Sequence, residues 1–103
     1  MPESTKMYRD KEKLQRVAKV MRTISHPMRL LIVELLLEHK RLPVKAIYES
    51  LGISQSNASQ HLKLMEQADI LLSQREGAMV YYSVVSKGMA QLLSAACQCA
   101  KVD

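Results

Sequence analysis

The stretch LGISQSNASQHLKLMEQADILL, residues 51–72, constrains the fold most because its character changes three times over a short distance. Gly52 suits the left-handed residue that ends a helix, and the hydroxyl of Ser54 can accept from the free amides at the start of the next helix. The apolar residues that follow Asp69 are typical of a strand. The stretch therefore predicts a helix end, a turn, a second helix and the beginning of a strand.

The helix after Ser54 has two different faces. At about 100° per residue, Ala58, Leu62 and Met65 fall on one narrow apolar stripe. The opposite face is polar and almost uncharged, and it carries Ser56, Ser59, Gln60, Lys63 and Gln67. Serine, asparagine and glutamine donate and accept at base edges in the major groove, which favours a DNA-recognition helix. A polar face that is only solvated is the alternative.

The size and composition of the chain predict one small domain. Its 103 residues suffice for a single domain over 1–103, with residues 1–5 as a frayed tail. Nearly half of the residues are apolar, but there is no Trp or Phe, so the core must be aliphatic. Such a thin domain gains by burying a helical stripe against a second copy, which predicts a homodimer.

The charge balance and the cysteine content restrict the partners and the compartment. Fifteen basic against ten acidic residues give a net charge of +5, which favours a polyanionic partner such as nucleic acid, although a soluble basic protein is the alternative. No apolar run is long enough for a membrane span or a signal peptide. Two cysteines separated by a single residue make no disulfide framework. We therefore expect a cytoplasmic protein without a membrane partner.

The periodicities along the chain predict a mainly α fold with a small β-hairpin. Helices are expected over 6–23, 27–39 and 43–51, before the recognition helix, and again from Ser86 onward. Strands are expected over 70–75 and 78–85, with the turn at Glu76 and Gly77. The second helix is apolar nearly all round, which predicts that it lies in the buried centre, with Glu34 on its rim. The first and last helices together are expected to form a dimer seam.

This order of elements is that of a winged helix-turn-helix domain, and three segments make the likeness specific. They are SHPMRLLIVELLL, ISQSNASQHLKLM and REGAMVYYSV. From about Val17 to Ala100 the chain resembles the ArsR/SmtB family of bacterial repressors. The resemblance implies a homodimer on double-stranded DNA, with its two recognition helices in successive major grooves of an inverted-repeat operator. The wings would then contact the flanking backbone or minor groove.

The resemblance also assigns roles to the residues of the DNA-binding surface. Residues expected at base edges are Gln55, Ser56, Ser59 and Gln60. Lys63 would contact a phosphate, Arg75 would make the wing contact, and Asn57 is a candidate at the flank. His61 lies between the apolar stripe and the polar face, so a DNA contact and packing against a neighbouring loop are both open.

The usual metal sites of the family are missing from this sequence. Metal-sensing relatives have cysteine at the positions of Pro43 and Lys45. Zinc-sensing relatives place ligands in the last helix at positions that align with Ser86, Gly88, Cys99 and Val102. Only one of those four is a ligand type, which makes no tetrahedral zinc site. Relatives with a dithiol sensor have one cysteine at the position of Glu34, so that pair is also broken.

Cys97 and Cys99 remain as candidate sensor residues. Residues two apart on a helix do not share a face, but a frayed helix end would let both sulfurs reach one soft ion. The hypothesis is that they bind trivalent arsenic or another thiophilic ion, or oxidise across the dimer, and thereby release DNA. The alternative is that Cys97 packs in the seam as a small apolar residue.

Two other classes of function were weighed against a sensor-controlled repressor. One is a winged-helix module for DNA binding or protein interaction that has no metal or redox response. The other is an enzyme, which the sequence does not favour because there is no glycine-rich phosphate loop. The three histidines also have no spacing that suggests a catalytic centre.

Overall fold

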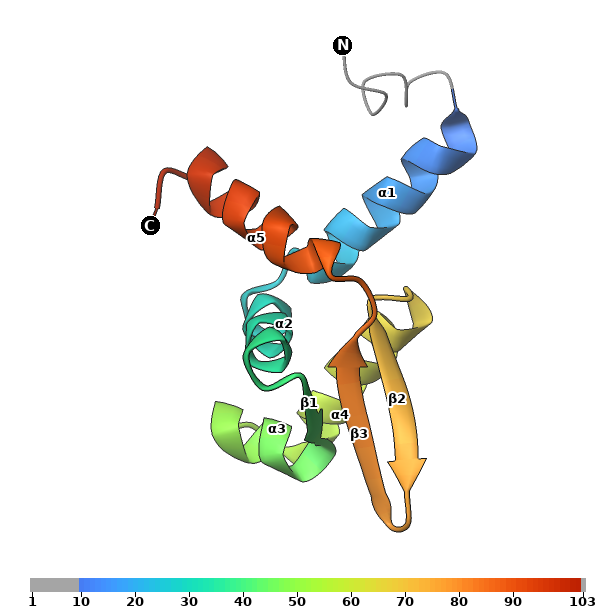
Figure 1. The fold of residues 1–103 in the computed structure, drawn as a ribbon, viewed down its shortest axis with the longest axis vertical. Coiled ribbons are helices and arrows are strands. Elements are labelled where there is room, and N and C mark those ends of the chain that lie inside the picture. Colours follow the sequence, from blue (N-terminus) through green and yellow to red (C-terminus); the bar gives the residue numbers. More distant parts are fainter. Residues whose placement is uncertain (1–9, 103) are drawn as a thin grey trace.

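The computed structural model describes residues 10–102, so the predicted tail at residues 1–5 lies outside the described residues. Two helices diverge as arms above a body of three helices and a small sheet (Figure 1). The arms are α1 (Lys11–Ile24) and α5 (Gly88–Cys99). The body contains α2 (Pro27–His39), α3 (Val44–Leu51), α4 (Gln55–Gln67), β1 (Arg41–Pro43), β2 (Leu71–Glu76) and β3 (Met79–Val84).

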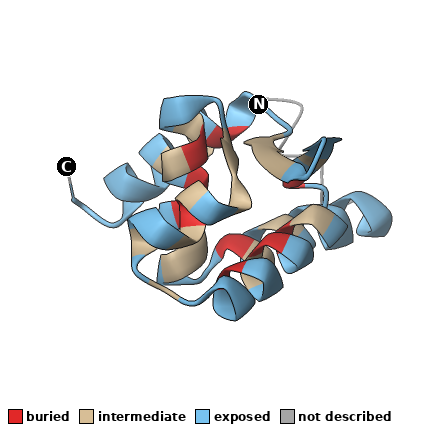
Figure 2. Ribbon diagram, turned by 90° about the horizontal axis from the view of Figure 1, so that it is seen from below, coloured by how far each residue is buried: buried red, intermediate tan, exposed pale blue. Residues whose placement is uncertain are grey.

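The core lies where α2, α3, α4 and the base of the sheet meet. Buried residues occupy the inward faces of these elements, whereas the arms are exposed along most of their length (Figure 2). The predicted apolar stripe of α4 is confirmed, because Ala58, Leu62 and Met65 have no exposed surface. This burial fixes which side of α4 faces outward, and that side is the polar one.

The turn between α3 and α4 has the predicted chemistry. Gly52 ends α3 with φ +66°, and Ile53 N–H donates to the carbonyl of Tyr48 at 3.2 Å. This is the hydrogen bond that closes a Schellman motif, and glycine adopts the left-handed conformation that the motif requires without strain. Ser54 is the N-cap of α4, where its hydroxyl accepts from Asn57 N–H at 3.1 Å. Gly52 thus ends α3 and Ser54 begins α4, and the short turn between them sets the angle between the two helices.

The sheet has three strands rather than the two that were predicted. Its order is β1-β3-β2, all antiparallel, with Leu42 opposite Tyr82. The two-residue hairpin loop is Gly77–Ala78, because Glu76 pairs with Met79 as the last strand residue. The predicted turn was therefore wrong by one residue. Gly77 has φ +63°, which suits the first position of a two-residue hairpin loop.

The first two helices also differ from the prediction. α1 begins at Lys11 rather than near Lys6, because the Asp10 carboxylate caps it by accepting from Lys13 N–H at 3.0 Å. α2 is not buried all round. Leu30 and Leu31 leave 37% and 46% of their surface exposed, while Glu34 is exposed, as expected for a rim position. α2 thus contributes both to the core and to an outward apolar surface.

Candidate nucleic-acid interface

The outward face of α4 is a polar surface with little charge. Its hollow, which we call the reading face, is lined by Ser54, Gln55, Ser56, Ser59, Gln60 and Lys63. All six residues are exposed. They lie on the side of α4 opposite the buried stripe, so the packing of that stripe in the core directs the reading face outward. Hydroxyl and amide groups that face outward on a helix can donate to and accept from the edges of base pairs.

A second groove lies between α3, the start of α4 and the tip of the β2–β3 hairpin, which we call the wing. Its volume is about 270 Å³, and it is lined by Pro43, Val44, Lys45, Tyr48, Gln55, Ser59, Ala78, Met79 and Val80. Lys45 and Tyr48 line this groove beside the reading face, and the sequence-based prediction of DNA contacts did not include them. A pattern in the sequence could have indicated them. Lys45 and Tyr48 lie three residues apart on α3, the first helix of the turn-linked pair, and therefore share one face of that helix.

The remaining predicted residues lie at the margins of the reading face. Asn57 is exposed, and its backbone amide is used in the N-cap of α4. Arg75 is exposed on β2, opposite Val80 and one residue pair from the tip of the hairpin. The reading face and Arg75 therefore belong to different elements, as a helix contact and a wing contact require.

His61 bonds to another helix. Its Nδ1 accepts from Arg29 Nε at 3.1 Å, and its ring centroid lies 4.9 Å from that of His26. Burial lowers the pKa of His61, and the nearby basic side chains of Arg29 and His26 lower the pKa further. His61 is thus partly buried and hydrogen-bonded to α2, while its role at DNA stays a prediction.

Glu66 links α4 to the wing. Its carboxylate accepts from Ser73 Oγ at 2.5 Å and from Tyr82 Oη at 3.4 Å, and these two residues belong to β2 and β3. Burial raises the pKa of Tyr82, and the adjacent Glu66 raises the pKa further, which keeps the phenol protonated as a donor. No spacing rule predicts this contact, because Glu66 and Tyr82 are sixteen residues apart.

The strand β1 is attached to the wing by a surface ion pair. The Arg41 guanidinium donates to both carboxylate oxygens of Glu76, at 2.6 and 3.2 Å, and it lies 4.1 Å from the centre of the Tyr81 ring. Hydrogen bonding to Arg41 lowers the pKa of Glu76. The far end of β2 is thereby joined to the segment that precedes α3.

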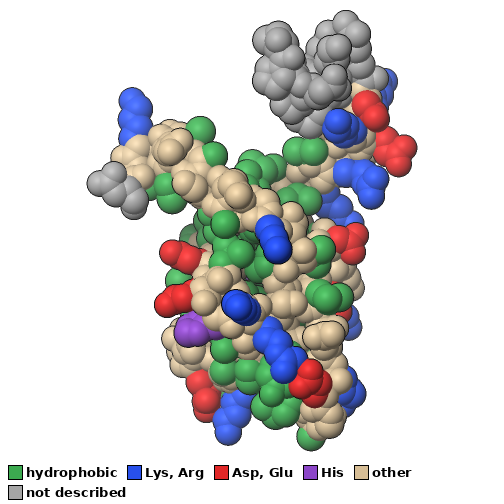
Figure 3. Space-filling model, viewed as in Figure 1, with side chains coloured by type: hydrophobic (Ala, Val, Ile, Leu, Met, Phe, Trp, Pro, Cys, Tyr) green, Lys and Arg blue, Asp and Glu red, His purple; other side chains and the backbone are tan. Residues whose placement is uncertain are grey.

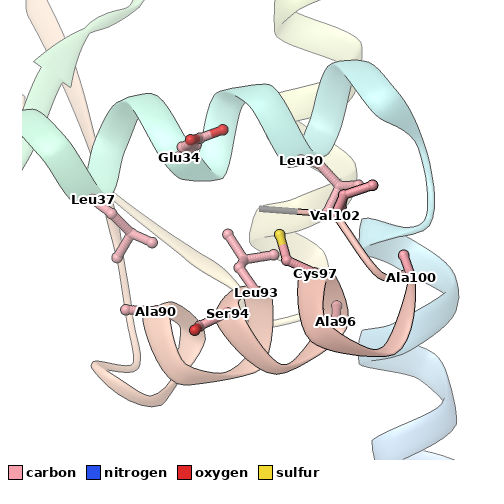
Figure 4. A pocket seen from close by; sticks show the side chains of 10 residues that line it. All are labelled: Leu30, Glu34, Leu37, Ala90, Leu93, Ser94, Ala96, Cys97, Ala100 and Val102. Atoms are coloured by element: carbon pink, nitrogen blue, oxygen red, sulfur yellow. The ribbon is translucent and has the colours of Figure 1, made fainter.

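The two arms carry exposed apolar residues. On α1 these are Leu14, Val17 and Met21, each with 39% to 43% of its surface exposed. Hydrophobic side chains gather where the arms meet the body (Figure 3). A groove of about 660 Å³ runs between α2 and α5, and most of its lining residues are apolar (Figure 4): Leu30, Glu34, Leu37, Ala90, Leu93, Ser94, Ala96, Cys97, Ala100 and Val102.

The two cysteines lie at the end of α5. The sulfur of Cys97 points into the groove toward α2 (Figure 4), and both thiols are free and exposed. This helix end is closed and does not fray in the way that would bring both sulfurs of one chain together. Val102 N–H donates to the Cys97 carbonyl at 3.0 Å and Lys101 N–H to the Gln98 carbonyl at 3.1 Å, which is a closed Schellman motif. Regular helix extends to Cys99, so the two sulfurs of one chain are directed to different faces.

Residues 10–102 contain neither a cluster of potential metal ligands nor a helix that could span a membrane. Within that range, no group of three or more His, Cys, Asp or Glu is placed to hold a metal ion. None of the helices in the same range is both long and apolar enough to cross a bilayer.

Comparison with known proteins gave matches over most of the chain. A family model described as a helix-turn-helix domain matches residues 24–74. The transcriptional repressor PagR of Bacillus anthracis is 43% identical over 67 residues, which cover 65% of this chain and 67% of PagR. The crystal structure of PagR has a TM-score of 0.74 at 38% identity and covers 82% of this chain and 99% of that one.

A solution structure of a second relative is also similar. It is the homodimeric winged helix-turn-helix DNA-binding domain Mb0332 of Mycobacterium bovis, a possible ArsR-family transcriptional regulator. Its TM-score is 0.80 at 27% identity, and the match covers 90% of this chain and 85% of that one. Together with PagR, this likeness confirms the predicted fold class.

Proposed function

Because the chain belongs to the ArsR/SmtB family of winged helix-turn-helix transcriptional repressors, we propose that it represses transcription as a homodimer bound to an inverted-repeat operator. The reading face of α4 carries this proposal, because the buried stripe of the same helix holds it outward. The proposed activity is binding without an enzymatic step, and it takes place in the cytoplasm, where the operator lies.

The contacts with DNA are divided between three elements. Gln55, Ser56, Ser59 and Gln60 read base edges from α4, and Asn57 contacts the flank. Lys63 neutralises a phosphate beside them, and Arg75 does so from the wing. The groove with Lys45 and Tyr48 adds a backbone contact between helix and wing. Since most contacts of this kind involve phosphates, affinity will fall steeply as the salt concentration rises.

The dimer is proposed to form through the arms. The relative Mb0332 is a homodimer, and this chain exposes an apolar stripe on α1 and an apolar groove beside α5. Helices α1 and α5, which carry these surfaces, lie at the end of the molecule away from the β2–β3 hairpin loop (Figure 1). A second copy seated there would bury them and would leave two reading faces free for two half-sites.

Gln60→Ala is expected to relax sequence preference. The variant loses a side chain that reads a base edge, so affinity for the operator should fall by about 1 to 3 kcal/mol while affinity for random DNA changes little. Arg75→Ala is the matched comparison, because loss of a phosphate contact weakens binding to every sequence alike. Fluorescence anisotropy on operator and scrambled duplexes measures both effects. Equal losses on both duplexes for both variants would show that the assignment of faces is wrong.

Release of the operator is proposed to depend on Cys97 and Cys99. The sulfur of Cys97 lies in the groove beside the proposed seam, and both thiols are exposed. Since the closed helix end directs the two sulfurs of one chain apart, a thiophilic ion such as trivalent arsenic would be shared with thiols of the second copy. Oxidation by a peroxide would instead join two thiolates across the seam as a disulfide, with the peroxide reduced to water or alcohol.

The double variant Cys97→Ser, Cys99→Ser tests this proposal. Arsenite or hydrogen peroxide is expected to release the unmodified protein from a duplex of its own upstream DNA, and the serine variant is expected to stay bound. Anisotropy titrations under anaerobic, reducing conditions before each addition provide the baseline. Continued release of the double variant would exclude these thiols as the sensor. Tight, specific binding by both proteins that is indifferent to every agent would favour the second candidate, a winged-helix module without a sensor.

A further inference from the structure

Arg29 joins three helices at the corner behind the recognition helix. Arg29 lies in the first turn of α2. Its Nη1 donates at 3.0 Å to the carbonyl of Thr23, which lies in the last turn of α1. Its Nε donates to Nδ1 of His61 at 3.1 Å, in the middle of α4. Both hydrogen bonds are partly buried. One planar side chain thus contacts the end of an arm and the helix that carries the reading face.

This arrangement defines the protonation state of His61. An imidazole nitrogen that accepts a hydrogen bond carries no proton, so the ring must be neutral with its proton on Nε2. His26 is the N-cap of α2, and its own Nδ1 accepts from Met28 N–H at 3.1 Å. Both imidazoles therefore use Nδ1 as an acceptor, and a proton on either one removes a hydrogen bond.

The surroundings of His61 are basic. From α2 and its N-cap, Arg29 and His26 face the ring, and Lys63 lines the same pocket from α4. The α1 end contributes only the neutral carbonyl of Thr23, through Arg29. In the described part of the chain, no acidic side chain lines this pocket. A protonated His61 would thus meet positive charge without a carboxylate to compensate for it.

We infer that Arg29 and His61 form a clasp that positions α4 against the α1–α2 corner, and that the clasp holds only while His61 is neutral. The inference rests on the proposed DNA-binding function, since it concerns how the reading face is presented. Protonation replaces the acceptor Nδ1 with an N–H that opposes the Arg29 donor. Gln60, the chain neighbour of His61, loses its fixed position on the reading face, so operator preference declines.

Two roles for His61 predict opposite responses to acid. If the ring contacted a DNA phosphate, protonation would add a cation at the interface and would strengthen binding. If it serves as the acceptor in the clasp, protonation weakens operator binding. The lowered pKa adds a response in the free protein as well. In the folded protein the pKa of His61 lies below 6.5. The neutral ring therefore stabilises the folded state above pH 6.5, and this stabilisation is lost as the pH falls through the pKa that His61 has in the folded protein.

The test compares three forms of the full chain. His61→Gln keeps an acceptor for Arg29 in its amide oxygen but does not titrate. His26→Asn keeps an N-cap acceptor and removes the neighbouring titratable group. Anisotropy is measured from about pH 8 to about pH 5.5, across the range in which histidine titrates, on a duplex of the chain's own upstream DNA and on a scrambled duplex. The readout is the ratio of the two affinities, which removes the general gain in charge at low pH.

The expected result is a fall of about tenfold in this ratio for the unmodified protein and for His26→Asn, with a flat profile for His61→Gln. A ratio that falls equally in His61→Gln, or that stays level or rises on acidification in the unmodified protein, would overturn the clasp. An unmodified protein with no operator preference at about pH 8, where histidine is neutral, would contradict the proposed function instead. In that case an NMR titration of His61 in the free protein decides whether the clasp forms: a pKa below 6.5 that rises in Arg29→Gln supports it, and an unchanged pKa excludes it.

Discussion

Val17→Glu is expected to convert the proposed dimer into monomers and to weaken operator binding by about 100-fold or more, because one monomer then binds a single half-site. Val17 leaves 40% of its surface exposed on α1, whereas Val20 and Ile24 attach the same helix to the core. The variant should therefore still fold. Sedimentation equilibrium gives the oligomeric state, and anisotropy on the operator duplex gives the affinity.

The matched control for this variant is Gln15→Glu. It makes the same change of charge on the same exposed helix but lies outside the stripe of Leu14, Val17 and Met21. The control should remain dimeric and should lose little affinity. If both variants stay dimeric, or if the monomeric variant binds the full operator with undiminished affinity, the proposed seam is wrong.

Leu62→Ala is expected to cost about 2 to 5 kcal/mol of the free energy of unfolding, because it leaves a cavity where α4 packs on the core. Leu62 has no exposed surface, whereas Leu64 on the same helix leaves 46% exposed. Leu64→Ala should therefore change the stability by no more than about 0.5 kcal/mol. Urea denaturation at equal protomer concentration measures both variants, since the stability of a dimer depends on concentration. Similar losses in the two variants would mean that the buried stripe does not anchor the helix.

Local chemistry explains why some parts of the fold could be predicted from sequence. Gly52 and Ser54 act through their own backbone and side chain, so their roles as helix end and helix start follow from residue type alone. Asp69 and Lys101 have equally left-handed backbones, with φ of +60° and +59°, but neither is a glycine. After Asp69, Ile70 is buried where α4 ends. That burial depends on tertiary contacts, so the left-handed backbone of Asp69 could not be predicted from the neighbouring residues in the sequence.

The parts that were missed depend on contacts between distant segments. β1 has three residues, too few for a periodicity, and it exists because β3 pairs with it forty residues later. The all-round apolar character of α2 could not separate residues buried in this chain's core from Leu30 and Leu31, which face outward. The contact of Arg29 with His61 spans 32 residues and follows from no spacing rule. In the candidate site, the reading face could thus be predicted, but its attachment to the rest of the molecule could not.

The placement of β1 has a consequence for self-association. Exposed strand edges can recruit strands of other molecules and begin aggregation. Here β3 is paired on both sides, and the outer strand β1 is three residues long and ends at Pro43, which lacks an N–H. The other outer strand, β2, carries Arg75 and Glu76 near its end. Growth of the sheet from copy to copy is thereby discouraged, and self-association is left to the proposed seam between the helical arms, which closes with two copies.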